Sequence, residues 1–183
     1  VKRLGVTVYI RKEVQDIHIA ATKVVLHLAT FNVVQRSMTL VWPLFTIPFQ
    51  SPPPGIMTFE NAHFRGGVQN RAQFELNDAD CTLETTQTEN LLTIKSGDIT
   101  AEIVLNDFDM TFRYKGRYLT STGHRQLGSA TTPAGSFMLE QLDMSVGEKV
   151  YGLGERFTPF VMNGQVVALW TEAGGPASAQ SST

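Results

Sequence analysis

Two glycines, an acid and a base stand together in the stretch VYGLGERF, and this order raises the question of phosphate binding. A dinucleotide-binding loop has Gly-X-Gly-X-X-Gly between a strand and a helix, so that backbone N–H groups approach a pyrophosphate. Here Gly152 and Gly154 fit, but Phe157 takes the third glycine position, and no helical pattern follows. We therefore interpret the stretch as a bend or close-packed strand segment in which Glu155 and Arg156 pair with neighbouring groups.

Two pairs of aspartates, Asp78-X-Asp80 and Asp107-X-Asp109, have the spacing that places two carboxyl groups on one side of an extended segment. Two carboxyl groups are what glycosidic hydrolysis requires, one as acid and one as nucleophile or base. Each pair also follows an asparagine in a segment with the composition of a loop or turn. Acids in such segments are usually only solvated, so we favour solvation over catalysis for both pairs.

The four histidines, His18, His27, His63 and His124, lack the i, i+4 spacing of metal ligands on a helix. Cys81 is the only cysteine, which excludes an internal disulfide and a multi-cysteine metal site. We therefore expect no metal and no organic cofactor. No Gly-X-Ser-X-Gly elbow supports a serine hydrolase.

Trp170 follows the apolar run Val-Val-Ala-Leu and precedes the pair Gly174-Gly175. An indole at this position can pack in the core of the protein, or it can give a sugar ring an apolar floor. The residue types alone leave both interpretations open.

The bulk composition excludes several classes of partner. The chain has 183 residues and a formal net charge of −2, and its 15 Lys and Arg residues are scattered, so no basic surface for nucleic acid is expected. No run of about 18 apolar residues could span a membrane. The single cysteine and the lack of any Asn-X-Ser/Thr acceptor favour a cytoplasmic location.

The hydrophobic pattern has period two and predicts strands. Residues 5–10 and 22–28 are rich in β-branched side chains, and residues 89–105 and 110–120 have the pattern of hairpins with loops at Ser96-Gly97 and Lys115-Gly116. We predict an all-β fold, an antiparallel β-sandwich, over residues 1–175. Residues 176–183 are small and polar and are expected to form a tail or the start of a linker.

Proline interrupts the pattern in one strand. Pro43 and Pro48 cannot donate to a sheet ladder, so the strand that contains them is expected to lie at an edge or to break there.

The segment 149–175, KVYGLGERFTPFVMNGQVVALWTEAGG, resembles a signature of glycoside hydrolase family 31, within its α-xylosidase branch. The upstream segments PLFTIPFQSPPPGI and HFRGG resemble entry strands of the same branch, so the resemblance covers roughly residues 40–175. The matching positions keep the family's order and spacing: Tyr151, Gly152, Gly154, Glu155, Arg156, Phe157, Asn163, Gly164, Gln165, Trp170, Gly174 and Gly175.

The resemblance implies a galactose-mutarotase-like β-sandwich, a supersandwich, that precedes a catalytic (β/α)₈ barrel in a retaining α-glycosidase. The two catalytic aspartates of the family lie on that barrel, which is absent from this chain, so no residue here is expected to be catalytic. The domain is expected to pack on its own barrel and to supply one loop to the rim of the sugar pocket. The family also continues with further strands where this chain reads PASAQSST, which implies a sandwich that is incomplete at the C-terminus.

The loop at the sugar pocket is expected to carry the substrate-binding positions Trp170, Glu172 and Ala173. The family has an Asp at the position of Ala173, where it hydrogen-bonds a sugar hydroxyl, and an alanine cannot make that contact unless Glu172 replaces it. The parent enzyme is expected to release α-linked xylose or glucose, and the isolated chain to be inactive. The alternative is a non-catalytic carbohydrate-binding or structural module.

The incomplete sandwich also has a physical consequence. Missing strands would leave an unpaired sheet edge and an uncovered apolar face. We therefore expect self-association or marginal stability of the isolated chain. Domains of this family also contribute to contacts between subunits, so a homo-oligomer is compatible with the resemblance.

Overall fold

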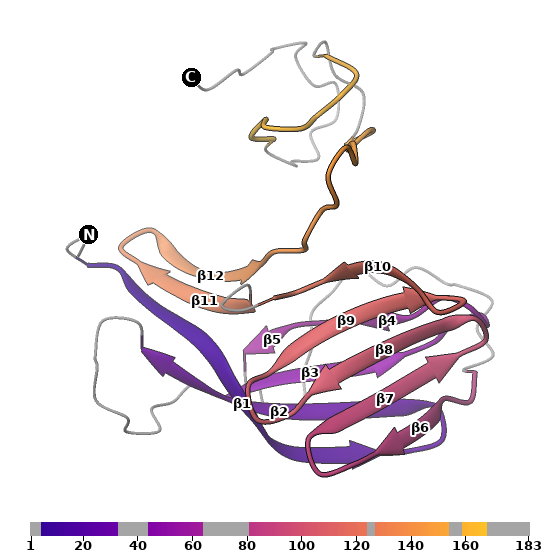
Figure 1. The fold of residues 1–183 in the computed structure, drawn as a ribbon. Helices are drawn as coiled ribbons and strands as arrows, with labels where there is room; N and C mark the ends of the chain where they lie inside the picture. The colour runs from indigo at the N-terminus through magenta and orange to yellow at the C-terminus, as the bar shows by residue number, and fades with distance from the viewer. Residues whose placement is uncertain (1–4, 33–43, 64–80, 124–126, 154–158, 168–183) are drawn as a thin grey trace. The chain divides into compact units, whose positions relative to one another are not determined.

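The computed structural model of the protein describes residues 5–32, 44–63, 81–123, 127–153 and 159–167 (Figure 1). The chain divides into two compact units, Val1–Asp143 and Met144–Thr183. All regular elements of the described residues are β-strands of the first unit. None of the described residues forms a helix that could cross a membrane. The domain boundary predicted at residue 175 lies outside the described ranges.

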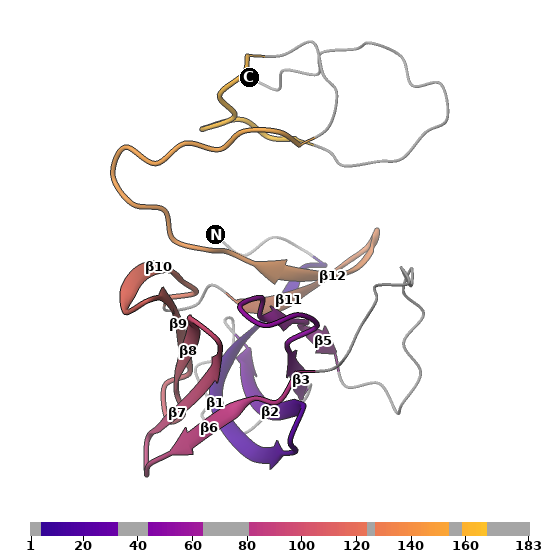
Figure 2. The same ribbon diagram turned by 90° about the vertical axis from the view of Figure 1, so that its right-hand side faces the viewer.

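The strands of the first unit form two antiparallel sheets, as the two views in Figures 1 and 2 show. One sheet has the order β12-β11-β1-β2-β3-β4, with β5 also beside β3. Its strands are β1 (Thr7–Ile19), β2 (Lys23–Asn32), β3 (Phe45–Gln50), β4 (Thr58–Phe59), β5 (Ala62–His63), β11 (Leu127–Thr132) and β12 (Gly135–Glu140). The other sheet has the order β10-β9-β8-β7-β6. Its strands are β6 (Glu84–Gln87), β7 (Leu91–Ser96), β8 (Ile99–Val104), β9 (Asp109–Tyr114) and β10 (Arg117–Ser121).

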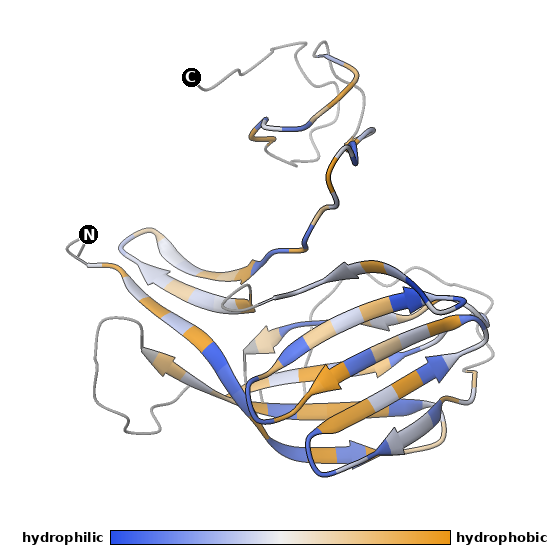
Figure 3. Ribbon diagram, in the orientation of Figure 1, coloured by the Kyte–Doolittle hydropathy of each residue, from blue (hydrophilic) through white to orange (hydrophobic). Residues whose placement is uncertain are grey.

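The core lies between the two sheets because alternate residues of both are apolar (Figure 3). Phe59 on β4 and Phe112 on β9 stack across the two layers, with 5.5 Å between their ring centroids. Full burial of one such large apolar side chain contributes roughly 1.5–3 kcal/mol, which makes this layer the main source of stability. The facing side chains are Val24, Leu26, Leu28, Phe45, Ile47 and Phe49 from the first sheet and Leu92, Ile94, Ala101, Ile103, Met110 and Phe112 from the second. The predicted antiparallel sandwich is confirmed.

The two predicted hairpins form, and one of them turns one residue later than expected. Lys115 and Gly116 have φ values of 50° and 79°, as the predicted two-residue loop requires. The loop between β7 and β8 is Gly97-Asp98 and not Ser96-Gly97. Ser96 stays in the strand because its hydroxyl is buried and lies 2.6 Å from that of Ser51, while Gly97 takes the positive φ of 56°.

Pro48 lies in β3, which is not an edge strand, and the pairing of β3 is interrupted on one side only. Pro43 lies outside the described residues. On one side β3 pairs with β2, and Val25 lies opposite Pro48. On the other side β3 pairs with β4 through Phe49 and Gln50 and with β5 through Phe45 and Thr46. The partner of β3 is thus divided into two short strands, with the gap opposite Pro48.

Strand β1 connects the two sheets through its backbone. Its pairing with β2 shifts register between Arg11 and Glu13 and again between Val14 and Asp16. In this irregular stretch the N–H of Val14 donates to the carbonyl of Leu105 at 2.9 Å. The N–H of Phe108 donates in turn to the carbonyl of Lys12 at 2.9 Å. The bulges thus leave β1 backbone groups to bind the turn between β8 and β9 of the other sheet.

The side chain of Arg11 makes a second connection between the sheets and is only 4% exposed. Its Nη1 donates to the hydroxyl of Thr122 at 2.8 Å, and its Nη2 donates to the carbonyls of Thr122, at 3.3 Å, and Gly123. The guanidinium lies 4.8 Å from the centroid of the Phe108 ring. A buried cation is stable only when its donors are satisfied, and here carbonyl, hydroxyl and π-electron partners surround it.

Replacement of Arg11 tests this connection. We expect Arg11→Ala to lower the free energy of unfolding by about 3–5 kcal/mol, because it removes one partner of a buried charged network. Lys12→Ala is the matched control, since the Lys12 side chain is only partly buried and its ion pair with Glu13 is 3.7 Å long. The control should change the value by less than about 1 kcal/mol. Urea titration followed by far-UV circular dichroism measures both variants, and equal effects would contradict the assigned role of Arg11.

Candidate functional site

The motif residues that the structure describes belong to the second unit, in two extended segments, 144–153 and 159–167. The N–H of Met162 donates to the carbonyl of Val150 at 2.9 Å and so joins the two segments. Met162 is the buried apolar residue of this pair of segments, with 8% of its surface exposed.

Asn163 holds the two segments together with its side chain. Its Oδ1 accepts from the N–H of Val150 at 2.9 Å, and its Nδ2 donates to the carbonyl of Glu148 at 3.0 Å. The amide thus supplies one acceptor and one donor to the opposite segment, as a backbone peptide group does in a ladder. An asparagine is the side chain that offers both groups at this reach, which gives a physical reason for this motif position.

The bend at Tyr151-Gly152-Leu153 has left-handed backbone geometry. Gly152 has a φ of 88° and Leu153 a φ of 66°. Nothing lies within 4 Å of a Cβ built on Gly152, so the glycine is required by its backbone angle and not by close approach. The Tyr151 ring lies beside that of Phe160, with 5.0 Å between centroids. Gly164 also has a positive φ, of 73°, in the turn after Asn163.

Gln165 makes a local contact. Its Nε2 donates to the carbonyl of Val161 at 3.1 Å, and its N–H donates to that of Met162 at 3.2 Å. The described part of the motif therefore forms a hydrogen-bonded backbone scaffold. The other predicted site residues lie outside the described ranges: Gly154, Glu155, Arg156, Phe157, Trp170, Glu172, Ala173, Gly174 and Gly175.

The candidate acid pair Asp107 and Asp109 lies beside the buried Arg11. Burial lowers the pKa of Arg11 to about 10, and the charges of Asp109 and Asp107 raise it again in part. One carboxylate oxygen of Asp109, Oδ1, is buried and has no hydrogen-bond partner among the described residues. These acids therefore balance a structural cation, a use that the sequence did not reveal because Arg11 is distant in the chain. Asp78 and Asp80 lie outside the described ranges.

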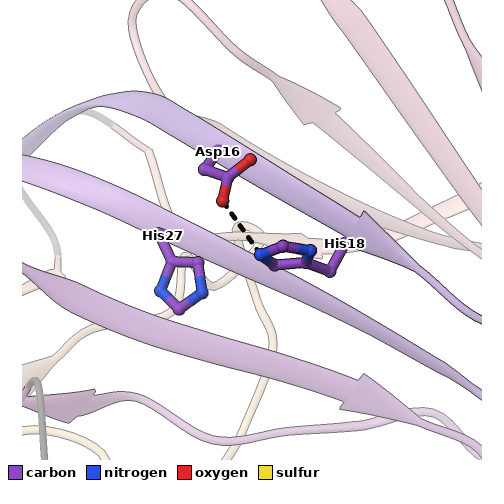
Figure 4. A group of neighbouring side chains, drawn as sticks. All are labelled: Asp16, His18 and His27. Atoms are coloured by element: carbon purple, nitrogen blue, oxygen red, sulfur yellow. Dashed lines mark ion pairs between the residues drawn. The ribbon is translucent and has the colours of Figure 1, made fainter.

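One group of described side chains could hold a metal ion: Asp16, His18 and His27 (Figure 4). One potential ligand atom from each lies within 4.8 Å of the others. His18 Nε2 is 2.9 Å from Asp16 Oδ2, and the Nδ1 of His27 is 3.3 Å from the hydroxyl oxygen of Thr46. The group faces away from the core on β1 and β2 and combines nitrogen and oxygen ligands.

Solved structures with the same architecture identify the class of domain. The chain is similar to the uncharacterized protein lmo2446 from Listeria monocytogenes EGD-e, with a TM-score of 0.66 and 16% identity over 87% of this chain and 14% of that one. A cycloalternan-forming enzyme from Listeria monocytogenes, solved with a pentasaccharide substrate, gives the same TM-score, identity and coverage. At this identity the likeness concerns the fold: a β-sandwich that is a small part of a much longer chain.

Sequence comparison gives the family. Residues 46–182 match the model of the glycosyl hydrolase 31 N-terminal galactose mutarotase-like domain, and the chain belongs to this family. It is 35% identical to an α-xylosidase of Emericella nidulans over 151 residues, covering 70% of this chain and 19% of that protein. It is 33% identical to the α-xylosidase XylQ of Lactiplantibacillus pentosus over 138 residues, covering 74% of this chain and 18% of that one. The chain thus spans about a fifth of the length of these relatives.

The role of Asn163 can be tested by amide hydrogen exchange. We expect Asn163→Leu to increase the exchange rates of the Val150 and Met162 amides at least tenfold, because a net hydrogen bond contributes about 1 kcal/mol and two are lost together. Asn163→Asp keeps the acceptor for Val150 and should have a smaller effect. Gln165→Ala, which removes a contact within one segment, is the control. Unchanged protection of both amides in Asn163→Leu would rule out this role of the Asn163 side chain.

Proposed function

We propose that this chain is the non-catalytic N-terminal domain of a retaining α-glycosidase of the α-xylosidase or α-glucosidase type. The observation that carries the proposal is family membership over residues 46–182 together with 35% and 33% identity to two α-xylosidases. The chemistry of a retaining enzyme needs two carboxyl groups about 5–5.5 Å apart, one as nucleophile and one as acid/base. The described acid pair Asp107-X-Asp109 lies close enough to the buried Arg11 to raise its pKa, which supports a structural use of these two acids.

The part of this chain in the reaction is to shape the rim of the sugar pocket. The loop after Trp170 is proposed to reach the sugar, with the indole as an apolar wall and Glu172 or Ala173 at the hydroxyl. A hydrogen bond to a substrate hydroxyl is worth roughly 1–3 kcal/mol when one partner is charged, so an alanine at this position weakens binding. The scaffold around Asn163 positions the chain that leads into this loop.

Strand β12 offers a surface for the rest of the enzyme. All six of its residues are exposed, and Phe137, Met138 and Leu139 are 51%, 40% and 41% exposed. Within the described residues β12 pairs only with β11 and is therefore an edge strand of its sheet. An unpaired edge with three consecutive large apolar side chains is a surface that proteins normally cover. We propose that the remainder of the same polypeptide, its barrel above all, covers this strand.

Activity measurements on two chain lengths test the proposal. We expect residues 1–183 alone not to hydrolyse an aryl α-xyloside, and the longer enzyme containing this domain to do so. In the longer enzyme, Ala173→Asp should raise kcat/KM roughly 5- to 150-fold, the equivalent of about 1–3 kcal/mol. Glu172→Gln tests whether Glu172 already makes this contact. If Glu172 makes it, the substitution lowers kcat/KM.

Two results would overturn this assignment. Turnover by residues 1–183 that is lost in Asp107→Asn or Asp109→Asn would make the chain an enzyme in its own right. A coding sequence that stops directly after Thr183 would favour the alternative, a carbohydrate-binding or structural module. The cytoplasmic location stays a prediction, for which fractionation of the source cells is the test.

Sedimentation velocity tests the surface proposed on β12. We expect residues 1–183 to self-associate as concentration rises, because Phe137 and Leu139 gain from leaving water at roughly 25 cal/mol per Å². The double variant Phe137→Ser/Leu139→Ser should shift the chain toward monomer. Ser136→Ala on the same strand is the control and should sediment like the parent. A parent chain that is monomeric at all concentrations contradicts the prediction.

A further inference from the structure

We propose that Asp16, His18 and His27 form a binding site for a zinc-like divalent cation on the outer face of the β1–β2 hairpin. The proposal is independent of the sugar pocket and of the glycosidase assignment. It rests on the placement of three side chains with suitable ligand chemistry (Figure 4).

Strand register brings the three residues together. Asp16 and His18 are two residues apart on β1 and so share a face. Ile17 between them packs partly buried against the core cluster, so its two neighbours point away from the core. Asp16 lies directly opposite His27 in the β1–β2 ladder. Two backbone strands therefore fix three ligand side chains on one outer surface.

The three ligand atoms are close enough for one ion to reach them all after small side-chain movements. His18 Nε2 and Asp16 Oδ2 are 2.9 Å apart, and all three ligand atoms lie within 4.8 Å of one another. Ligands of a tetrahedral zinc with bonds of about 2.0–2.1 Å lie about 3.3–3.4 Å from each other. The His18 and Asp16 side chains are 66% and 58% exposed, so side-chain rotations can close the remaining gap. As an ion pair alone, such an exposed contact contributes at most about 1 kcal/mol.

Neighbouring groups contact two of the ligands. The Nδ1 of His27 faces the Thr46 hydroxyl oxygen at 3.3 Å, so its Nε2 is the nitrogen left for a metal. Thr46 is held directly opposite His27 in the β2–β3 ladder. The Oδ1 of Asp16 accepts from the N–H of Ile17 at 2.9 Å, which leaves Oδ2 to bind. His27 is thus oriented by a group that does not itself bind the ion, while the exposed side chains of Asp16 and His18 can adjust to it.

The ligand set selects the class of ion. Two imidazoles and one carboxylate suit Zn²⁺ and its neighbours in the first transition row, whereas Ca²⁺ and Mg²⁺ prefer oxygen ligands throughout. Three protein ligands leave a fourth position for water. Because the ligands come from both strands, a bound ion would cross-link β1 and β2 and stabilise the hairpin.

Calorimetric titration of the full 183-residue chain with ZnCl₂ tests the site. We expect one Zn²⁺ per chain, and at least tenfold weaker binding in His18→Ala and in His27→Ala. The control is the double variant His63→Gln/His124→Gln, which removes the other two histidines of the sequence and should bind Zn²⁺ as the parent does. MgCl₂ in excess should not compete.

A thermal measurement separates loss of binding from loss of fold. Zn²⁺ should raise the Tm of the parent and of the control, and should leave the Tm of His18→Ala and His27→Ala unchanged. The ligand side chains lie outside the core, so far-UV circular dichroism without metal should be the same for all variants. The proposal fails if Zn²⁺ does not bind, if the two alanine variants bind as tightly as the parent, or if Mg²⁺ competes equally.

Discussion

The fold depends on the contact between two apolar sheet faces and on the hydrogen-bond partners of one buried charge, Arg11. Alternate residues of β2 and β3 face those of β7, β8 and β9, and such a contact excludes water. Arg11 lies beside this layer. A buried guanidinium without hydrogen-bond partners would destabilise the fold by more free energy than several apolar contacts contribute. The turn between β8 and β9 and the residues after β10 supply its partners. The position of β1 across the sandwich is therefore fixed by charge neutralisation as well as by packing.

Most of the fold could be predicted from the sequence because its information is local. Period-two alternation and a glycine at the second loop position identify strands and hairpins without reference to distant residues. The errors have distant causes. The β7–β8 loop begins one residue late because the hydroxyl of Ser96 is buried against Ser51, which is 45 residues earlier. No local pattern could show that contact.

The functional residues were less predictable for the same reason. The family resemblance marked Asn163, but its role follows only from the two backbone groups that it binds, at Val150 and Glu148. The i, i+4 spacing identifies metal ligands on a helix, whereas the regular elements of the described residues are strands. On strands, ligands come together when they are two residues apart on one strand or directly opposite each other on neighbouring strands. Which residues lie opposite each other depends on the register of β1 and β2, which the sequence alone does not give.

The surroundings of the described acids bear on the proposed role of a supporting domain. Hydrolysis needs two carboxyl groups that face one bond, one of them with a raised pKa. Partial desolvation raises the pKa of Glu140, although much of its surface is exposed, and this acid lies at the end of β12, whose other residues are not acidic. Several other described acids are paired with cations of the sandwich: Glu84 with Lys95, Asp98 with Lys115, and Glu102 with Arg113. These pairs join neighbouring strands or loops of one sheet, and at exposed positions such a contact contributes at most about 1 kcal/mol.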